Sequence, residues 1–350
     1  AAAPAAVHCR SEQHLQFRPP PDARAPRPKA FEFDRVFGPA STQAEVFDEV
    51  APLITSVVDG YHACILAYGQ TGSGKTHTME GPEEDPGINA RAIQELFHVK
   101  EDFEKGGLKT MRLEVGVLEI YNETIRDLLV TSYSTPDMAG AVRQETLEIR
   151  QRSEGDVYVE GLRRHAVGDL PGLRRALRRA QAHRAVSATK CNAHSSRSHS
   201  VVLLDVTVAN LAGAGAERRG RLVLVDLAGS ERVARSGAEG QRLKEAAAIN
   251  RSLSALGDVI SALRTRQNKN DKTSLGHIPY RNSKLTYLLQ DSLGAENKAL
   301  MIVQVSPEAH DADETLCSLN FGARVRCVEL GQARAHGGGG DDGAAAAAAD

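Results

Sequence analysis

The sequence lacks the features of a membrane-spanning, secreted or disulfide-stabilised protein. No apolar run approaches the roughly 20 residues that a transmembrane helix needs, and residues 1–6 lack the basic start and long apolar stretch of a secretory signal. The five cysteines form no CxxC pair, which disfavours a zinc site and is typical of a reducing compartment: Cys9, Cys64, Cys191, Cys317 and Cys327. We therefore expect a cytoplasmic protein with no membrane partner.

The sequence also lacks a strong net charge. Its formal charge of -2 gives no global field that would draw the chain onto nucleic acid or an anionic membrane. We therefore expect no nucleic-acid partner, and any polyanionic partner must meet a local patch. The hydrophobic fraction of 41% and the charged fraction of 25% are those of an ordinary globular protein, and 350 residues can form one large enzyme domain with short tails.

The two ends of the chain differ in composition from its middle. Residues 1–30 are rich in Ala, Pro and Arg, and only Val7 to Phe17 has the pattern of an edge strand. Residues 333–350 end in a glycine run and an alanine run, which bury too little apolar surface to offset their ordering entropy. We expect one domain over residues 31–332 between these tails.

Between the tails, strand-like apolar segments alternate with helical patterns. The strand-like segments are Cys64–Tyr68, Met111–Tyr121, Val201–Val208, Leu222–Leu227 and Leu300–Val305. Apolar residues at spacings of three and four predict helices at Glu45–Val58, Ile88–Phe97, Leu170–Arg184, Glu245–Leu263 and Ser283–Leu293. The alternation predicts an α/β fold, with a central, mostly parallel or mixed sheet covered by helices on both faces. We expect the basic helix surface from Arg174 to Arg184 to be solvated.

The strongest motif is a phosphate-binding loop. Residues 69–76 spell GQTGSGKT, which matches GxxxxGK[ST], follows an apolar strand and runs into a helix. The glycines let backbone N–H groups surround a β-phosphate, Lys75 places a positive charge beside the β- and γ-oxygens, and the Thr76 hydroxyl ligates Mg²⁺. The predicted phosphate-binding residues are Gln70, Thr71, Gly72, Ser73, Gly74, Lys75 and Thr76.

Two further segments are typical of sensors of a γ-phosphate. Asp226 follows an apolar run and opens the sequence DLAG, so it can reach the water shell of the metal while the Gly229 N–H approaches the γ-phosphate. Residues 192–199 (NAHSSRSH) form a dense polar stretch between a helix and a strand. By composition alone this stretch is equally consistent with a solvated loop, and the phosphate loop favours the nucleotide-sensing role.

A GTPase is the alternative nucleotide-binding class, because residues 268–271 spell NKND, which fits the guanine-selecting pattern NKxD. In a GTPase this pattern follows a buried strand, whereas here it follows the polar run Arg264–Gln267 after a long helix. Lys75 and Asp226 are also 151 residues apart, about three times the separation expected in a compact GTPase. Both observations disfavour guanine specificity.

The chain resembles the kinesin motor family, because it carries a series of motifs in the order of that family. These are FDRVF (33–37), YGQTGSGKT (68–76), EIYNE (119–123), DLL (127–129), NAHSSRSH (192–199), DLAGSE (226–231), INRSLSALG (249–257) and HIPYRNSKLT (277–286). The resemblance implies the kinesin motor fold, a P-loop ATPase that uses ATP and Mg²⁺ and moves along microtubules. The alternative left open is a nucleotide-binding, non-motile microtubule-binding module.

The resemblance also implies roles for residues of the two switch segments. Ser196 would complete the Mg²⁺ shell with Thr76, and Asn192 with Ser195 would hold switch I closed on the nucleotide. Arg197 and Glu231 would form a bidentate salt bridge that closes both loops and orders the attacking water. Gly229 would be the hinge of switch II, because its φ/ψ freedom lets that loop move when the γ-phosphate leaves. The expected catalytic set is Asn192, Ser195, Ser196, Arg197, Asp226, Gly229 and Glu231.

In the same family reading, the helix Glu245–Leu263 would relay the nucleotide state to the microtubule. Residues 264–284 carry six basic side chains against the single acid Asp271, a local net charge of +5 that would be attracted to the acidic surface of tubulin. Without the resemblance, such a run is more often a solvated face. The expected microtubule contacts are Arg264, Arg266, Lys269, Lys272, Arg281 and Lys284.

The two ends of the domain complete the resemblance. The sequences LNFGARV (319–325) and VELG (328–331) resemble the ending of the C-terminal-motor, minus-end-directed kinesins, which dimerise through a neck that would lie outside this chain. Family members open with a strand ending in Arg-x-Arg-Pro, whose proline and a residue after the phosphate loop, here His77, sandwich the adenine. Only Phe17-Arg18-Pro19 resembles that ending, so we expect a degenerate or truncated first strand.

Overall fold

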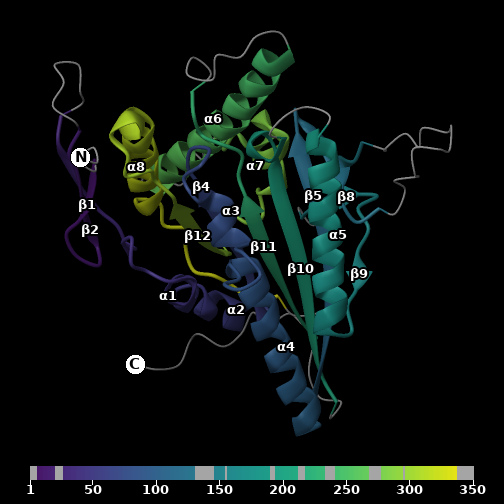
Figure 1. Ribbon diagram of the computed structural model, residues 1–350. Coiled ribbons are helices and arrows are strands. Elements are labelled where there is room, and N and C mark those ends of the chain that lie inside the picture. Colours follow the sequence, from purple (N-terminus) through teal and green to yellow (C-terminus); the bar gives the residue numbers. More distant parts are fainter. Residues whose placement is uncertain are drawn as a thin grey trace.

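A mixed β-sheet between two layers of helices forms the centre of the molecule (Figure 1). The computed structural model describes residues 6–19, 27–130, 146–153, 156–189, 194–211, 217–232, 241–267, 277–294 and 296–336. The strand order is β12-β4-β11-β10-β5-β6, and β9 pairs with β5. The bounds are β4 His62–Tyr68, β5 Lys109–Tyr121, β6 Thr124–Asp127, β9 His165–Ala166, β10 His199–Asn210, β11 Arg218–Asp226 and β12 Lys298–Val303.

The sheet combines parallel and antiparallel pairing. β4 pairs in parallel with both β11 and β12, whereas β10 is antiparallel to β11 and β5, and β6 is antiparallel to β5. All five predicted strands are present, and the prediction of a mixed sheet is confirmed. The alternative of a mostly parallel sheet is wrong, because apolar runs do not distinguish a strand buried in parallel pairing from one buried in antiparallel pairing.

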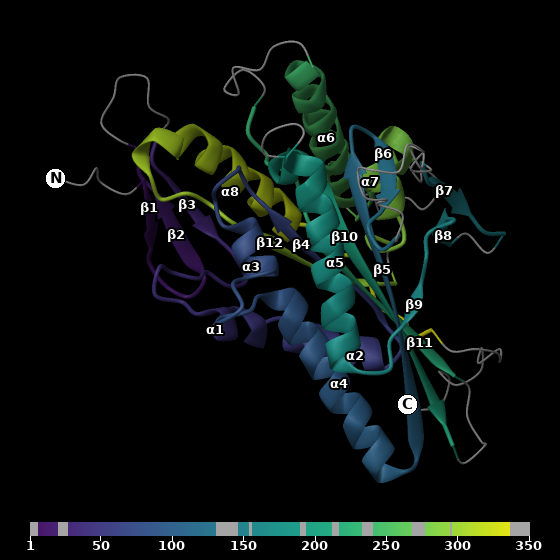
Figure 2. The same cartoon turned by 45° about the vertical axis from the view of Figure 1, so that its right-hand side comes forward.

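Helices cover both faces of this sheet, as predicted (Figures 1 and 2). Along β4, Ile65 and Ala67 pack into one core and Leu66 and Tyr68 into the other, as the alternation of a strand requires. One face carries α2 (Ala51–Val58), α3 (Lys75–Met79), α4 (Ile88–Gly106) and α5 (Leu170–Thr189); the other carries α6 (Gln241–Gln267), α7 (Lys284–Leu288) and α8 (Ala312–Arg326). None of the described helices is long and apolar enough to cross a membrane.

Two predicted helices differ from the observed ones. The segment predicted as one helix is divided into α1 (Gln43–Asp48) and α2, because Pro52 lacks an N–H and its ring would clash with the carbonyl of Asp48 four residues earlier. The helix predicted to run from Ser283 to Leu293 begins as expected, with Ser283 and Thr286 forming a capping box. It ends at Leu288 and continues as turns.

The N-terminal segment forms a small antiparallel sheet against α8. Its strands are β1 (Val7–Cys9), β2 (His14–Phe17) and β3 (Lys29–Glu32). Phe17 is fully buried and belongs to a core cluster with Phe31 and Leu319. Residues 7–17, expected to be one edge strand within a tail, therefore form a hairpin that packs on the domain. The remaining hairpin pairs β7 (Glu148–Gln151) with β8 (Val157–Glu160).

Candidate nucleotide-binding site

The phosphate loop connects the end of β4 to the start of α3, and its glycines are required by its backbone. Gly72 and Gly74 have φ values of 80° and 102°, a left-handed conformation that side chains disfavour. At Gly69 a Cβ atom would lie 2.2 Å from the carbonyl oxygen of Gln304. The loop is closed by Ser73, whose N–H and hydroxyl both donate to the carbonyl of Gln70. The spacing of the motif thus corresponds to a preformed turn.

Lys75 points back into this loop. Its side chain is buried, and Nζ donates to the carbonyl oxygens of Gly69 and Gln70, at 2.8 Å each. Burial lowers the pKa of Lys75, and the nearby Asp226 carboxylate opposes that shift. An ammonium group has three N–H donors, so one donor remains for an anion such as a phosphate oxygen.

Thr76 and Asp226 form the second part of the site. The Thr76 hydroxyl donates to Asp226 Oδ2 at 2.8 Å. Asp226 is 4% exposed, and its other oxygen, Oδ1, is buried without a hydrogen-bond partner in the part of the chain that the structure describes. A buried carboxylate oxygen without a donor is unfavourable, and a hard divalent cation or its water shell would satisfy it. The residues present therefore fit Mg²⁺.

Backbone hydrogen bonds connect the switch II segment (residues 226–231) both to the switch I segment (residues 192–199) and to the phosphate loop. The Gly229 N–H donates to the Ser196 carbonyl at 2.9 Å, and the Ser230 N–H donates to the Gly69 carbonyl at 3.1 Å. Asn192 and the side chain of Ser195 lie outside the described residues. The structure thus brings the phosphate loop together with two segments that lie more than 100 residues further along the sequence.

The predicted salt bridge between Arg197 and Glu231 is not formed among the described residues. Arg197 Nη1 lies 2.9 Å from Glu245 Oε2 of α6. Glu231 instead accepts hydrogen bonds from the N–H and hydroxyl of Thr71 in the phosphate loop, at 2.8 and 2.6 Å. Each partner of the predicted pair is therefore satisfied locally, and in this structure the bridge between the switch segments is replaced by two separate contacts.

Gly229 is also required for a steric reason, while its role as a hinge stays a prediction. It has no left-handed φ, so its conformation is open to any residue. A Cβ atom at this position would lie 2.3 Å from Thr71 Oγ1 and 2.3 Å from a carboxylate oxygen of Glu231. Glycine is needed here because it leaves space for the Glu231–Thr71 contact.

Comparison with known proteins decides the family. The model of the kinesin motor domain matches residues 3–328. The chain belongs to the kinesin motor domain family. It is 51% identical over 306 residues to Kinesin-like protein KIN-14E of Oryza sativa subsp. japonica, which covers 87% of this chain and 26% of that protein. The chain thus spans about a quarter of the length of such curated relatives.

Solved kinesin structures share the fold of this motor domain. The structure of a fast kinesin, described with its ATPase mechanism and interactions with microtubules, superposes with a TM-score of 0.82 at 35% identity, covering 95% of this chain and 88% of that one. The C-terminal motor and motor homology domain of Kar3Vik1 gives a TM-score of 0.76 at 38% identity, covering 91% of this chain and 78% of that one. The resemblance to the C-terminal-motor kinesins and the predicted kinesin fold are confirmed.

Arg184 is a residue of the motor site that the sequence analysis did not identify. Its side chain is 7% exposed, donates to the Ser198 carbonyl at 3.2 Å, and places Nη1 3.7 Å from Asp226 Oδ2 and 3.9 Å from Glu80 Oε1. The prediction that the basic surface of α5 is solvated is therefore wrong for this arginine, and correct for the exposed Arg174, Arg175, Arg178 and Arg179. The signal was present, because Arg184 continues the apolar face formed by Leu173, Leu177 and Ala180.

The basic residues predicted to contact a microtubule are only partly described. Arg264 and Arg266 are exposed in the last turn of α6. Arg281 is exposed, and its guanidinium lies 5.3 Å from the centre of the Tyr287 ring. Lys284 is paired with Glu148, and its side chain is 29% exposed. Lys269 and Lys272 lie outside the described residues, as does the NKND sequence.

His77, the residue predicted to contact the adenine, is exposed on α3. Its ring is open to a base, and adenine stacking stays a prediction.

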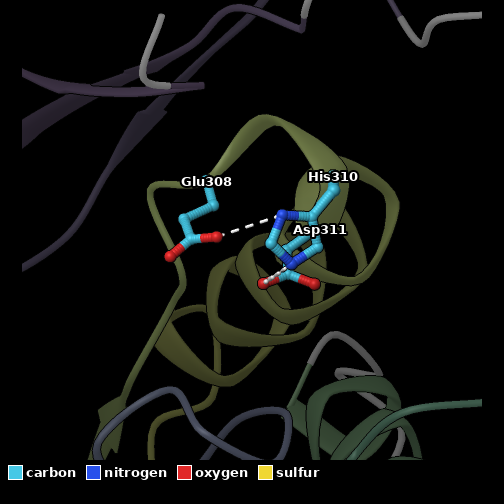
Figure 3. A group of neighbouring side chains, drawn as sticks. All are labelled: Glu308, His310 and Asp311. Atoms are coloured by element: carbon cyan, nitrogen blue, oxygen red, sulfur yellow. Dashed lines mark ion pairs between the residues drawn. The ribbon is translucent and has the colours of Figure 1, made fainter. Parts of the chain in front are cut away.

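A cluster of charged side chains lies on the surface before α8. It consists of Glu308, His310 and Asp311 (Figure 3), with the two His310 ring nitrogens 3.0 Å from Glu308 and 3.4 Å from Asp311. His310 and Glu308 are 67% and 65% exposed, and we interpret the group as a surface ion-pair cluster.

Proposed function

We propose that this chain is the motor domain of an ATPase that is stimulated by microtubules and couples ATP hydrolysis to force or movement along them. The observation that carries the proposal is the hydrogen-bonded contact of switch II with the phosphate loop and with switch I, centred on Lys75, Thr76 and Asp226. Such an arrangement places a γ-phosphate sensor against the track-facing helix α6. The kinesin relatives, including one described with its microtubule interactions, support the same function.

Each segment would have a separate task in hydrolysis. ATP bound with Mg²⁺ supplies the transferable phosphoryl group and the charge that stabilises its loss. Residues 70–76 would hold the phosphates, Thr76 and Ser196 would ligate the metal, and Asp226 would orient the water around it. Arg184 is within ion-pair distance of Asp226 and would hold that carboxylate in place. His77 would contact the adenine.

Glu231 and Arg197 would exchange partners during the cycle. In this structure the Glu231 carboxylate accepts a hydrogen bond from the Thr71 N–H, so its negative charge lies beside the phosphate loop. A bound triphosphate raises the negative charge there, which favours movement of Glu231 towards Arg197. Arg197 would then leave Glu245 for the approaching Glu231, so that the bridge forms in the ATP state and shields the attacking water.

Replacing Gly229 with Ala tests the close approach at switch II. The added Cβ would displace the Glu231 carboxylate and the Thr71 hydroxyl, so we expect ADP affinity to stay within about threefold while stimulated turnover falls at least about tenfold. Steady-state ATPase assays and a fluorescent ADP titration measure the two effects. Gly257→Ala is the matched control, because a Cβ at Gly257 would meet only Phe321 at 3.8 Å. Equal behaviour of the two variants would contradict the assignment.

The proposed track-binding surface consists of Arg264, Arg266, Lys269, Lys272, Arg281 and Lys284. Its positive charge would attract acidic tubulin and make binding sensitive to salt. We further propose association with the microtubule cytoskeleton in the cytoplasm, minus-end-directed movement, and dimerisation through a neck outside this chain, which the resemblance to the C-terminal-motor kinesins implies.

The double variant Arg264→Ala, Arg266→Ala tests this surface. We expect the microtubule concentration for half-maximal ATPase to rise about three- to tenfold while turnover without microtubules is unchanged, because the two guanidinium groups are exposed at the end of α6. The double variant Arg174→Ala, Arg175→Ala makes the same charge change on α5, across the sheet, and is the control (Figure 2). An equal rise in both variants would show a general charge effect.

The experiment that tests the function is a steady-state ATPase assay with and without microtubules. In a motor, product release is expected to limit the turnover without microtubules, and microtubule binding accelerates that step. We therefore expect turnover to rise at least about tenfold when microtubules are added. The non-motile alternative predicts nucleotide binding without stimulation, and that result would replace the proposed function.

A further inference from the structure

A buried chain of hydrogen bonds joins the switch II segment to α6 through His199. His199 begins β10 and is 3% exposed. Its Nδ1 lies 3.0 Å from the backbone nitrogen of Ala228 in switch II, and its Nε2 lies 2.8 Å from the hydroxyl of Ser252 in α6. Ser252 is itself 2% exposed. One imidazole ring therefore contacts both elements away from water.

The chemistry of the partners fixes the direction of these hydrogen bonds. The Ala228 N–H can only donate, so His199 Nδ1 accepts and carries no proton. Burial, reinforced by the positive charges of Arg184 and Lys75, lowers the pKa of His199 to about 3, so the ring is neutral and its one proton lies on Nε2. Nε2 donates to Ser252, whose hydroxyl donates in turn to the Ile249 carbonyl at 2.8 Å. These hydrogen bonds all run in one direction, and they satisfy both ring nitrogens of His199 and the hydroxyl of Ser252.

We propose that His199 is a positioning residue that couples the switch II segment to α6 through its hydrogen bonds to Ala228 and Ser252. The inference rests on the proposed function, since it concerns how the nucleotide site would reach the track-facing helix. Ala228 precedes Gly229 and Ser230, which bond to switch I and to the phosphate loop. A movement of this segment on γ-phosphate loss would leave Nδ1 buried without a donor, unless the ring and Ser252 moved with it.

The position of Ser252 in α6 would allow such a movement to be transmitted along the helix. Arg264 and Arg266 are 12 and 14 residues further along the same helix, or about 18 to 21 Å at the rise of an α-helix. The helix is continuous between these points, and its buried residues Leu256, Val259 and Ile260 pack against the sheet. A displacement at Ser252 would therefore reach the exposed end of α6 through a stiff element.

Ser252→Ala tests the link, because it removes the acceptor of the His199 Nε2–H without changing any residue assigned to nucleotide binding. We expect basal ATPase within about twofold of the wild type and a fall of about tenfold in the ratio of stimulated to basal turnover. A second readout is hydrogen exchange of the α6 amides with ADP and with a non-hydrolysable ATP analogue. The difference between the two nucleotides is expected to shrink to less than about half in the variant.

Ser261→Ala is the matched control, because the Ser261 hydroxyl bonds only within α6, to the Gly257 carbonyl at 2.8 Å, among the described contacts. If Ser252→Ala unfolds, the pair Ser252→Thr and Ser252→Val replaces it, since the two side chains have the same shape and only threonine keeps the hydroxyl. The threonine variant should retain the coupling and the valine variant should lose it.

The two failures are distinguishable. Ser252 variants that match Ser261→Ala in both the stimulation ratio and the exchange difference would overturn the role of His199, while a stimulated wild type would leave the proposed function standing. A wild type without microtubule stimulation would overturn the proposed function, and the hydrogen-exchange comparison would still decide whether His199 transmits the nucleotide state to α6.

Discussion

Replacing Lys75 with Ala is expected to weaken ATP binding at least about 100-fold. Lys75 Nζ is held 2.8 Å from the Gly69 and Gln70 carbonyls, so the ammonium is aimed into the phosphate loop before any ligand arrives. Its removal leaves the phosphate charge without its main side-chain partner, and charge-assisted hydrogen bonds to buried groups are worth about 1.5–3 kcal/mol each. Titration of a fluorescent ATP analogue measures the loss.

Two variants make this result specific. Lys75→Arg keeps the charge but brings a larger, planar group into a buried position, so we expect it to recover little of the affinity. Lys105→Ala removes a lysine that is 73% exposed on α4 and should bind ATP as the wild type does. Unchanged affinity in Lys75→Ala would show that the phosphates bind elsewhere.

The single variants Arg197→Ala and Glu231→Ala are expected to bind ATP within about threefold of the wild type and to lower stimulated turnover about 100- to 1000-fold. The reason is that their bridge would form only when both switch segments close, so its loss raises the barrier to hydrolysis without weakening ground-state binding. ATP titration and single-turnover hydrolysis separate these effects. Glu231→Ala also removes the carboxylate that accepts from Thr71 of the phosphate loop in this structure. The ATP affinity of this variant therefore shows whether the loop itself has been disturbed.

Glu245 provides the control for this pair, because it is the partner of Arg197 in this structure. Glu245→Gln keeps an acceptor for Arg197 in a buried position and should hydrolyse ATP within about threefold of the wild type. The charge-swapped variant, Arg197→Glu with Glu231→Arg, should exceed either single variant in turnover. Should Glu245→Gln lose as much activity as Arg197→Ala, the functional partner of Arg197 is Glu245 and the bridge to Glu231 is wrong.

The parts of the site that follow from local sequence could be predicted, and those that depend on tertiary contact could not. The phosphate loop is contiguous, and the left-handed φ values that require Gly72 and Gly74 arise within the same short segment. The partner of Arg197 depends on where α6 lies, and two carboxylates compete for it. A motif therefore identified both switch segments, but it could not decide which ion pair this structure contains.

The fold shows the same limit. The long apolar strands were predictable because burial on both faces requires uninterrupted apolar residues. The break at Pro52 was not predicted, although the missing N–H of proline favours one there. The antiparallel pairing of β10 with β5 and β11 was not, since strand direction leaves no mark in an apolar run. Arg184 was predicted to be solvated because it ends a run of basic residues, although it lies on the apolar face of α5.

The most direct test of the central claim is the affinity of the wild-type motor domain for microtubules in two nucleotide states. Cosedimentation with ADP and with a non-hydrolysable ATP analogue gives both dissociation constants under the same salt conditions. If the γ-phosphate sensor is coupled to the basic end of α6, the affinity is expected to be at least about tenfold higher with the ATP analogue, a coupling free energy of about 1.4 kcal/mol. Equal affinities in the two states would contradict the coupling and identify the chain as a passive microtubule binder.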